Sequence, residues 1–426
     1  MKLGKLSLVA VLALGTSAFA IDNVKVNGEA KLWYQSSETS GTTQTGNVSP
    51  NTIKNTNGLD FFDHNINSMA EATLVMGATM DLLPNLSAGI SGVALTTLGL
   101  ENNLVGMVPA ARYDSTPANA DDLDANALSD QAWVRELYLA YTMGKTTVKI
   151  GRQELATPLA FTEKWNVVDN TFEAAVVLNN DLPDTTLVGA WVGKHNASSY
   201  LNTTVVQGGK FSTFGTDGAY AAGAINKSLP NTTIQAWYYD VVQVADAYWL
   251  QADTKVMNMV TLGAQYANMD PKASGVKTND IFAVKAGVDV ANSNFYAAYS
   301  SAGTGNGATN FSNVATGDKS MIYTALGSVY FDGENTTKAD TDAWKIGAST
   351  KMVPGVGLSA SYAEAETGDN AGTGTKADYN AWDIIATGNV GPLGLTAIYT
   401  EYEKESSTGT KLVDTDTFRV IASLKF

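Results

Sequence analysis

The sequence predicts an all-β protein whose strands close into an antiparallel transmembrane barrel. The clearest sign is the last ten residues, which alternate apolar and polar side chains and end on Phe426. Successive side chains of a strand point to opposite faces, so this segment has one apolar and one polar face. The same alternation recurs along the chain. No stretch after residue 20 reaches the roughly 18 consecutive apolar residues of a spanning helix. Strands are therefore predicted to cross the bilayer.

The N-terminus has the form of an export signal. Lys2 and Lys5 precede an apolar stretch and a small-x-small cleavage pattern that ends at Ala20. Such a segment is removed from the mature protein and is too short to anchor it in a membrane. We expect residues 1–20 to be a signal peptide and residues 21–426 to form one β-barrel domain in a bacterial outer membrane.

Composition and charge narrow the functional class. The chain has no cysteine, which excludes disulfides, thiolate metal sites and cysteine nucleophiles. Its formal charge of −15 argues against nucleic acid as a partner, because neutralising phosphates requires a basic surface. Neither of the two histidines has neighbours with the spacing of metal ligands, and no motif organises an acid–base set around them. We therefore expect no enzyme.

Acidic residues gather in the predicted loops. The plainer interpretation is that they keep the loops soluble, and the functional one is a negative vestibule that attracts cations. Asp121, Asp122 and Asp124 are weak candidates for a loop-bound divalent cation such as calcium, which prefers carboxylate oxygens. Apart from such an ion, no cofactor is expected.

Eighteen alternating segments are predicted as strands, and sixteen is the alternative if two weak segments are misassigned. The predicted strands are residues 24–35, 68–80, 86–96, 131–142, 146–153, 171–178, 185–193, 218–226, 232–242, 247–255, 259–268, 280–290, 294–301, 341–351, 358–366, 377–388, 393–402 and 414–426. Short turns alternate with longer connections, so with periplasmic termini the long loops are extracellular. An even number also closes an antiparallel sheet without a free edge. The apolar stretch 321–331 is either a loop excursion or an extra strand.

Two segments in the middle of the chain resemble a known family. Residues 134–141 (VRELYLAY) and 148–155 (VKIGRQEL), together with both chain ends, are similar to the major outer-membrane porins of Campylobacter-type bacteria. The related outer-membrane porin D family shares the Gly-Arg-Gln element, then a proline (here Pro158) and a Thr-Phe-Glu strand start (here 171–173). The resemblance implies an eighteen-stranded, often trimeric porin that passes small hydrophilic solutes and ions by diffusion.

The resemblance also implies that the connection after the fifth strand, residues 154–170, folds inward and narrows the pore. The charged residues of this connection are Glu154, Glu163, Lys164 and Asp169. Its apolar residues Leu155, Leu159, Phe161 and Trp165 are suited to hold it against the wall. An ordinary surface loop is the alternative.

The wall opposite this loop is expected to carry basic residues, which would set up a transverse field across the pore. A lipid-facing lysine or arginine at the midplane costs about 2–4 kcal/mol, whereas a lumen-facing one costs little. The seven basic residues assigned to the pore wall are Lys31, Arg135, Lys149, Arg152, Lys285, Lys345 and Arg419. Arg135 and Glu136 cannot both face inward unless the strand is bulged. Arg152 has the outward parity of Ile150 and is expected at the rim.

These observations predict a passive, cation-preferring diffusion channel. One alternative is a substrate-specific channel, although the seven scattered basic residues do not form a clear ladder. The other is a surface adhesin or structural barrel whose long loops, 36–67 and 97–130, bind host or matrix. The expected partners are membrane lipid, small solutes and ions, further copies in a homotrimer, and the barrel assembly machinery, which would recognise Phe426.

Overall fold

The computed structural model describes residues 21–40, 60–62, 68–100, 112–113, 128–196, 209–305, 310–317, 319–329, 333–368 and 376–426. The predicted signal peptide and the candidate calcium ligands Asp121, Asp122 and Asp124 lie outside the described residues. Most of the two long loops also lies outside them.

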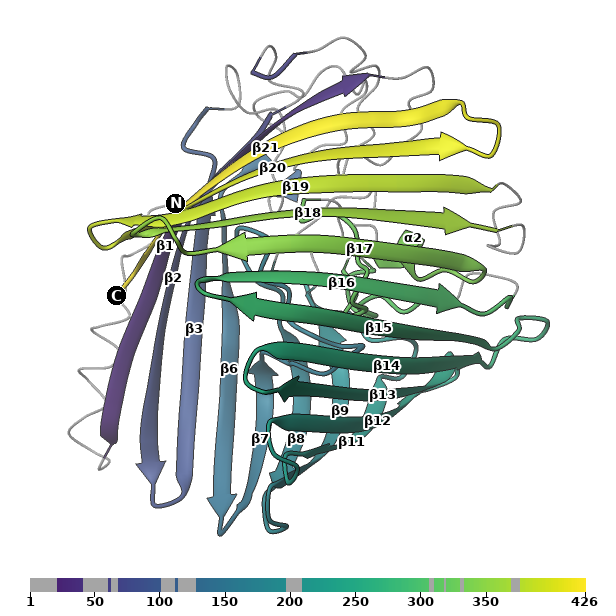
Figure 1. Ribbon diagram of the computed structural model, residues 1–426. Coiled ribbons are helices and arrows are strands. Elements are labelled where there is room, and N and C mark those ends of the chain that lie inside the picture. The colour runs from purple at the N-terminus through teal and green to yellow at the C-terminus, as the bar shows by residue number, and fades with distance from the viewer. Residues whose placement is uncertain are drawn as a thin grey trace.

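Long antiparallel strands dominate the described residues and wind around a common axis (Figure 1). The first nine are β1 (Asp22–Ser40), β2 (Ser68–Leu83), β3 (Leu86–Thr96), β6 (Gln131–Met143), β7 (Thr146–Gln153), β8 (Phe172–Asn179), β9 (Thr185–His195), β11 (Ala219–Asn226) and β12 (Thr232–Val241). The last nine are β13 (Ala245–Val256), β14 (Val260–Pro271), β15 (Asn279–Val290), β16 (Ser293–Ala302), β17 (Thr341–Thr350), β18 (Val356–Thr367), β19 (Ala377–Val390), β20 (Leu393–Ser406) and β21 (Lys411–Lys425).

Each of these strands pairs with its sequence neighbours, and β21 pairs with β1, which closes the barrel. Closure leaves no strand edge unpaired in the membrane, where an unsatisfied backbone group costs several kcal/mol. The prediction of an eighteen-stranded barrel is confirmed. The remaining described elements are short: β4 (Arg112–Tyr113) pairs with β5 (Leu128–Ser129), β10 (Ser212–Thr213) pairs with the end of β9, and α2 spans Gly333–Thr336.

The connections alternate in length, as an outer-membrane barrel requires. The start of β1 and the C-terminal residue Phe426 lie at the end of the barrel that carries only short turns (Figure 1). Several of these turns place Asn85, Gly144 or Gly391 at positive φ, the conformation of tight hairpin turns. The long connections leave the strands at the opposite, extracellular end, where the connections 242–244 and 407–410 are nevertheless as short as the periplasmic turns.

Alternation along each strand separates the lipid face from the lumen. In β1, Leu32 is 54% exposed on the outside, whereas its neighbour Trp33 is 1% exposed on the inside. The last residue, Phe426, exchanges two backbone hydrogen bonds with Gly28 of β1. A Cβ atom on Gly28 would lie 2.5 Å from the Phe426 ring. The absence of a side chain at Gly28 therefore makes room for the terminal ring.

Candidate functional site

Residues 154–171, here called the first inward segment, lie inside the barrel. The segment follows β7 and contacts the inner face of the barrel wall at strands that lie on either side of β7. The indole of Trp33 in β1 donates to the carbonyl of Trp165 at 3.4 Å, and the amide of Leu159 donates to the hydroxyl of Tyr239 in β12 at 3.5 Å. Leu155, Leu159 and Phe161 of the segment are buried against the wall, which excludes an exposed surface loop.

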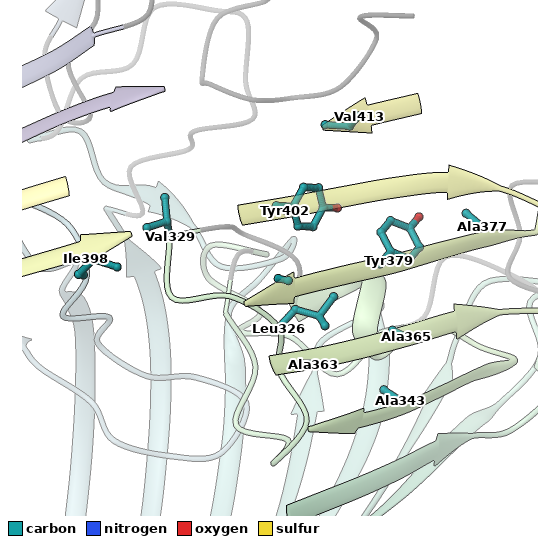
Figure 2. Close-up of a cluster of buried hydrophobic side chains, with 11 residues drawn as sticks. Leu326, Val329, Ala343, Ala363, Ala365, Ala377, Tyr379, Ile398, Tyr402 and Val413 are labelled. Carbon is teal, nitrogen blue, oxygen red and sulfur yellow. The ribbon is translucent and has the colours of Figure 1, made fainter. Parts of the chain in front are cut away.

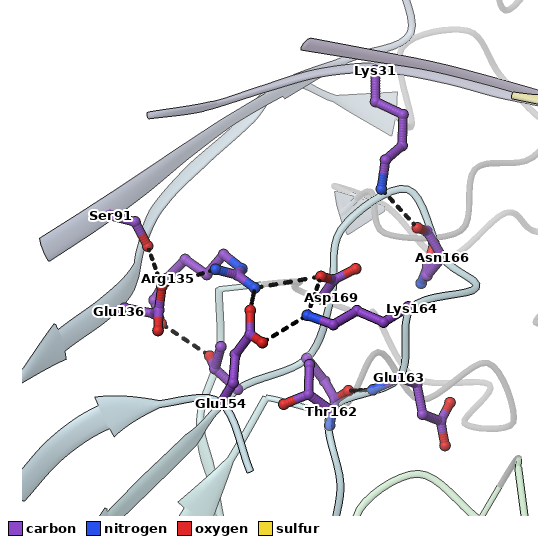
Figure 3. Close-up of polar contacts among 12 residues, drawn as sticks. Lys31, Ser91, Arg135, Glu136, Glu154, Thr162, Glu163, Lys164, Asn166 and Asp169 are labelled. Atoms are coloured by element: carbon purple, nitrogen blue, oxygen red, sulfur yellow. Dashed lines mark hydrogen bonds and ion pairs between the residues drawn. The ribbon is translucent and has the colours of Figure 1, made fainter. Parts of the chain in front are cut away.

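An ion cluster attaches this segment to β6 (Figure 3). The Arg135 guanidinium contacts Glu136 at 3.0 Å and Asp169 at 3.4 Å, and it also pairs with Glu154. The Lys164 ammonium lies 2.7 Å from Glu154 and 2.8 Å from Asp169. Arg135 is buried, whereas the Lys164 side chain is 58% exposed. The cluster therefore presents a charged surface with three carboxylates against two cations.

A β-bulge explains how Arg135 and Glu136 both join this cluster. In the pairing of β3 with β6, Ser91 faces Glu136 and Gly92 faces Val134, so Arg135 is left without a partner. One extra residue in the strand shifts the alternation, and two consecutive side chains then point inward. The sequence left the facing of these two residues open, and the bulge resolves it.

The ion cluster shifts the pKa values of Glu154 and Lys164. Burial alone would raise the pKa of Glu154, but hydrogen bonds from Lys164 and the charge of Arg135 outweigh it and hold that pKa below its ordinary value of 4.5. Burial alone would lower the pKa of Lys164, but Asp169 and Glu154 outweigh it and raise that pKa above 10.5. Both groups are therefore charged at neutral pH.

Glu163 of the first inward segment points away from the ion cluster. Its carboxylate accepts hydrogen bonds from the Asn313 amide at 2.9 Å and the Thr316 hydroxyl at 2.5 Å, and also from the Trp165 indole. The Asn313 amide donates as well to the carbonyl of Phe161 at 2.8 Å. The predicted constriction residues thus divide into two groups, because Glu154, Lys164 and Asp169 meet Arg135 while Glu163 contacts another segment.

That other segment comprises residues 310–317 and 319–329, here called the second inward segment. It lies inside the barrel between β16 and β17 and forms no strand of the wall. Asp383 of β19 accepts hydrogen bonds from the amide and hydroxyl of Ser328 at 2.9 and 3.0 Å. Gln265 of β14 donates to the carbonyl of Met321 at 2.9 Å. The apolar stretch at 321–329 is therefore a loop excursion into the lumen, and Phe331 lies outside the described residues.

Apolar contacts hold the same segment against β17 to β21. Leu326 and Val329 pack on inward-facing side chains of the wall, many of them alanines (Figure 2). The inward alanines are Ala343, Ala363, Ala365, Ala377 and Ala381. A water-filled lumen would favour polar residues at these positions. This run of small apolar residues at inward parity is the sequence signal that could have predicted the second inward segment.

The predicted basic residues lie inside the barrel with one exception. Lys31 and Lys345 donate to backbone carbonyls of the two segments, at Asn166 (3.4 Å) and Ala325 (2.7 Å). The remaining inward contacts are Lys285 with Asp253 at 2.8 Å, Lys149 over the Tyr138 ring at 3.6 Å, and Arg419 with Gln35 and the Trp33 ring. These cations therefore bind backbone carbonyls of the two segments, a wall carboxylate, aromatic rings and the Gln35 amide oxygen.

Arg152 does not belong to the pore wall. It pairs with Leu137 across β6, and Leu137 is 54% exposed on the outer face. Residues opposite each other in a sheet share a face, so Arg152 points outward. There it binds Glu173 at 2.9 Å and packs on the Phe211 ring. Its assignment to the pore wall is corrected, whereas its outward parity agrees with the alternation.

Within the described ranges, no three histidine or acidic side chains come together as a metal would require. No helix in the same part of the chain is long and apolar enough to cross a membrane. Two segments of the chain thus lie inside a barrel whose described inner face carries charged and polar groups.

A closed barrel with a lipid-compatible outer face and charged residues inside defines an outer-membrane channel. The model of the OprD family of outer membrane porins matches residues 114–426, so the chain belongs to that family. It is therefore a porin of the bacterial outer membrane and not an enzyme.

Solved structures support the same architecture. Pseudomonas aeruginosa OccK1 (OpdK) gives a TM-score of 0.67 at 16% identity over 95% of this chain and 98% of that one. The same organism's OpdK with vanillate gives 0.68 at 16% identity over 95% and 98% of the two chains. Acinetobacter baumannii OccAB3 gives 0.68 at 11% identity over 95% and 99%. These likenesses show the fold alone, and comparison with curated proteins finds no match.

Proposed function

We propose that the protein is a general-diffusion channel for ions and small hydrophilic solutes, with a preference for cations. The observation that carries this proposal is the ion cluster on the first inward segment, where Glu136, Glu154 and Asp169 outnumber Arg135 and Lys164. Charged groups at a narrow point of a pore act on ions at close range and decide which sign passes. The side chains that are directly ion-paired carry a net negative charge, which favours cations, and the charge of Lys149 acts on Glu136 and Glu154 from further away.

The state of the lumen cations supports the same preference. Lys31 and Lys345 donate to backbone carbonyls, and Lys285 pairs with Asp253. A substrate-specific anion channel would need a row of basic groups directed at the solute. The contacts of these lysines are directed at the protein, which supports passive diffusion over anion-specific uptake.

The test is the single-channel current of the purified protein under a potassium chloride gradient. Large open steps and a reversal potential on the potassium side are expected. The substitution Glu154→Gln should lower the potassium preference and Lys164→Gln should raise it. Lys194→Gln is the matched control, because Lys194 pairs with Glu173 on the outer face and should change neither. A reversal potential favouring chloride in the unmodified protein would contradict the proposal.

The finer placement of the chain is proposed as well. Its segments 134–141 and 148–155 support membership among the major outer-membrane porins of Campylobacter-type bacteria. Gly151 in the second segment has φ +127°, and a Cβ there would lie 2.1 Å from the Leu137 carbonyl, so this position requires glycine. A structural alignment in which those porins carry another residue type at this place would count against the assignment.

Assembly is the last part of the proposal. We propose a homotrimer, to be measured by analytical ultracentrifugation in detergent, where a monomer at all protein concentrations would contradict it. The barrel assembly machinery is proposed to recognise the strand that ends on Phe426. Phe426→Ala should reduce the amount of heat-modifiable barrel in the outer membrane, and an unchanged amount would oppose this role.

A further inference from the structure

An apolar recess opens at the extracellular end of the lumen, beside the two inward segments. Its volume is about 500 Å³. The wall strands β9 and β11 to β14 and the two inward segments supply most of the lining. The connections beside these strands supply the rest, namely Phe214, Gly215, Val244, Ala273 and Val276. Representative lining residues are Val192, Ala221, Val241, Ala247, Met269 and Val314.

The position of this recess is unusual for a porin lumen, whose inner face is ordinarily polar. Elsewhere in the described barrel, inward apolar residues are covered, as Leu326 and Val329 cover the alanines of β17 to β19 (Figure 2). In the recess, the inward faces of β11 to β14 are equally apolar, yet the described residues leave a cavity over them. Apolar surface that the described residues leave uncovered is suited to an apolar ligand.

The polar groups at the recess are already used within the protein. The Thr157 hydroxyl donates to the carbonyl of Ala160 at 2.8 Å, and the Tyr239 hydroxyl accepts from the Leu159 amide at 3.5 Å. Asn313 is engaged by Phe161 and Glu163. None of the lining residues is charged. Nothing in the lining would compensate an ion for its lost hydration.

We propose that the recess binds an uncharged small solute whose body is an apolar ring or short chain. Its volume lies within the range of small-molecule sites, about 300–1,000 Å³. Water in an apolar cavity finds few hydrogen-bond partners, so an apolar solute displaces it readily. The recess is formed partly by Leu155 and Leu159 of the first inward segment, so a bound solute lies against the segment that narrows the channel.

This inference goes beyond diffusion of hydrophilic solutes, which needs no apolar site. It depends on Leu155, Leu159 and the apolar wall, and the ion cluster does not contribute to it. Binding and ion selectivity can therefore fail independently of one another.

The test uses adamantan-1-ol as the probe and glucose as a polar neutral solute of comparable size. Single-channel current is recorded in potassium chloride while each is added to the extracellular side. Adamantan-1-ol should reduce the current in a saturable way, and glucose should not. Ala221→Phe should raise the half-saturating concentration of adamantan-1-ol at least tenfold. The reason is that Ala221 lies between Ala190 and Tyr239, which also line the recess.

The matched control is Ala222→Phe, one residue further along the same strand. Ala222 pairs with Tyr238 on the exposed outer face, so this change leaves the recess intact and should keep the response of the unmodified protein. Ala247→Phe, between Tyr239 and Met269, is a second filling variant if Ala221→Phe fails to form a heat-modifiable barrel. An equal response in the filling and control variants would show partitioning into lipid and would overturn the proposal.

A silent channel would count against the diffusion function and would leave the recess to be tested separately. Saturation-transfer NMR on the protein in lipid nanodiscs then measures probe contact directly. Transfer to adamantan-1-ol that Ala221→Phe abolishes and Ala222→Phe keeps supports the recess. Equal transfer in all three proteins refutes it.

Discussion

The two inward segments occupy the same lumen and both pack apolar side chains on the wall, but their polar attachments differ. The first is attached through an ion cluster, in which Arg135 and Lys164 meet three carboxylates. The second is held mainly by neutral donors on Asp383 and by apolar contacts with alanines of the wall. Removing one member of the ion cluster disturbs all the others, whereas removing one contact of the second segment leaves its other contacts in place.

Replacing Arg135 by alanine should have the largest effect. The change leaves Glu136, Glu154 and Asp169 with Lys164 as the remaining cation of the cluster, and breaking a buried pair costs about 3–5 kcal/mol. The first segment should detach, with a higher conductance and a lower midpoint of thermal unfolding. The control is Arg152→Ala on the outer face, where a half-exposed pair is worth about 0–1 kcal/mol. Equal effects of Arg135→Ala and Arg152→Ala would show that the ion cluster contributes no more than the outer-face pair.

Replacing Asp383 by alanine should release part of the second segment. The Ser328 amide and hydroxyl and the Thr400 hydroxyl lose their acceptor in a buried place. The expected loss is about 2–3 kcal/mol of unfolding free energy, with a smaller rise in conductance than for Arg135→Ala. Ser361→Ala, which removes a 3.4 Å contact to the same carboxylate, should have little effect. A conductance rise larger than that of Arg135→Ala would show that the attachment of the second segment matters more to the open pore than that of the first.

Glu163→Gln tests whether the two segments act as one unit. Glutamine presents an amide donor where Asn313, Thr316 and Trp165 all donate, which should cost about 1–2 kcal/mol. Hydrogen exchange should then accelerate in both segments. Faster exchange in only one of them would show that they are independent. Glu173→Gln on the outer face is the matched control.

The pH dependence should be the smallest effect and should report on the first segment. Because the pKa of Glu154 is lowered, its contribution is present above the ordinary 4.5 and is lost as the pH falls through the lowered value. Because the pKa of Lys164 is raised, its contribution is present below 10.5 and is lost as the pH rises through the raised value. Conductance should therefore be constant between these limits and increase in stronger acid. In Glu154→Gln the acid response should be reduced, and an unchanged response would assign it to another group.

Much of the barrel could be predicted from the sequence because alternation is a local property. Each strand carries its own two faces, so Leu32 and Trp33, or Phe418 and Arg419, could be assigned without knowing their neighbours. The turns and the parity of the connections then favoured eighteen strands over the alternative of sixteen. The inward position of residues 154–170 came from a resemblance, because its own residues fit a surface loop equally well.

The sequence by itself determined the closed barrel and the face of most side chains, since these follow from a two-residue period and from the need to leave no edge in lipid. It favoured eighteen strands and left sixteen as the alternative. Only the tertiary structure decided the rest. The bulge that turns Arg135 and Glu136 inward depends on the register with β3. The second inward segment and the apolar recess depend on which parts of the wall are covered. Such features arise from contacts between residues far apart in the chain, which local alternation does not encode.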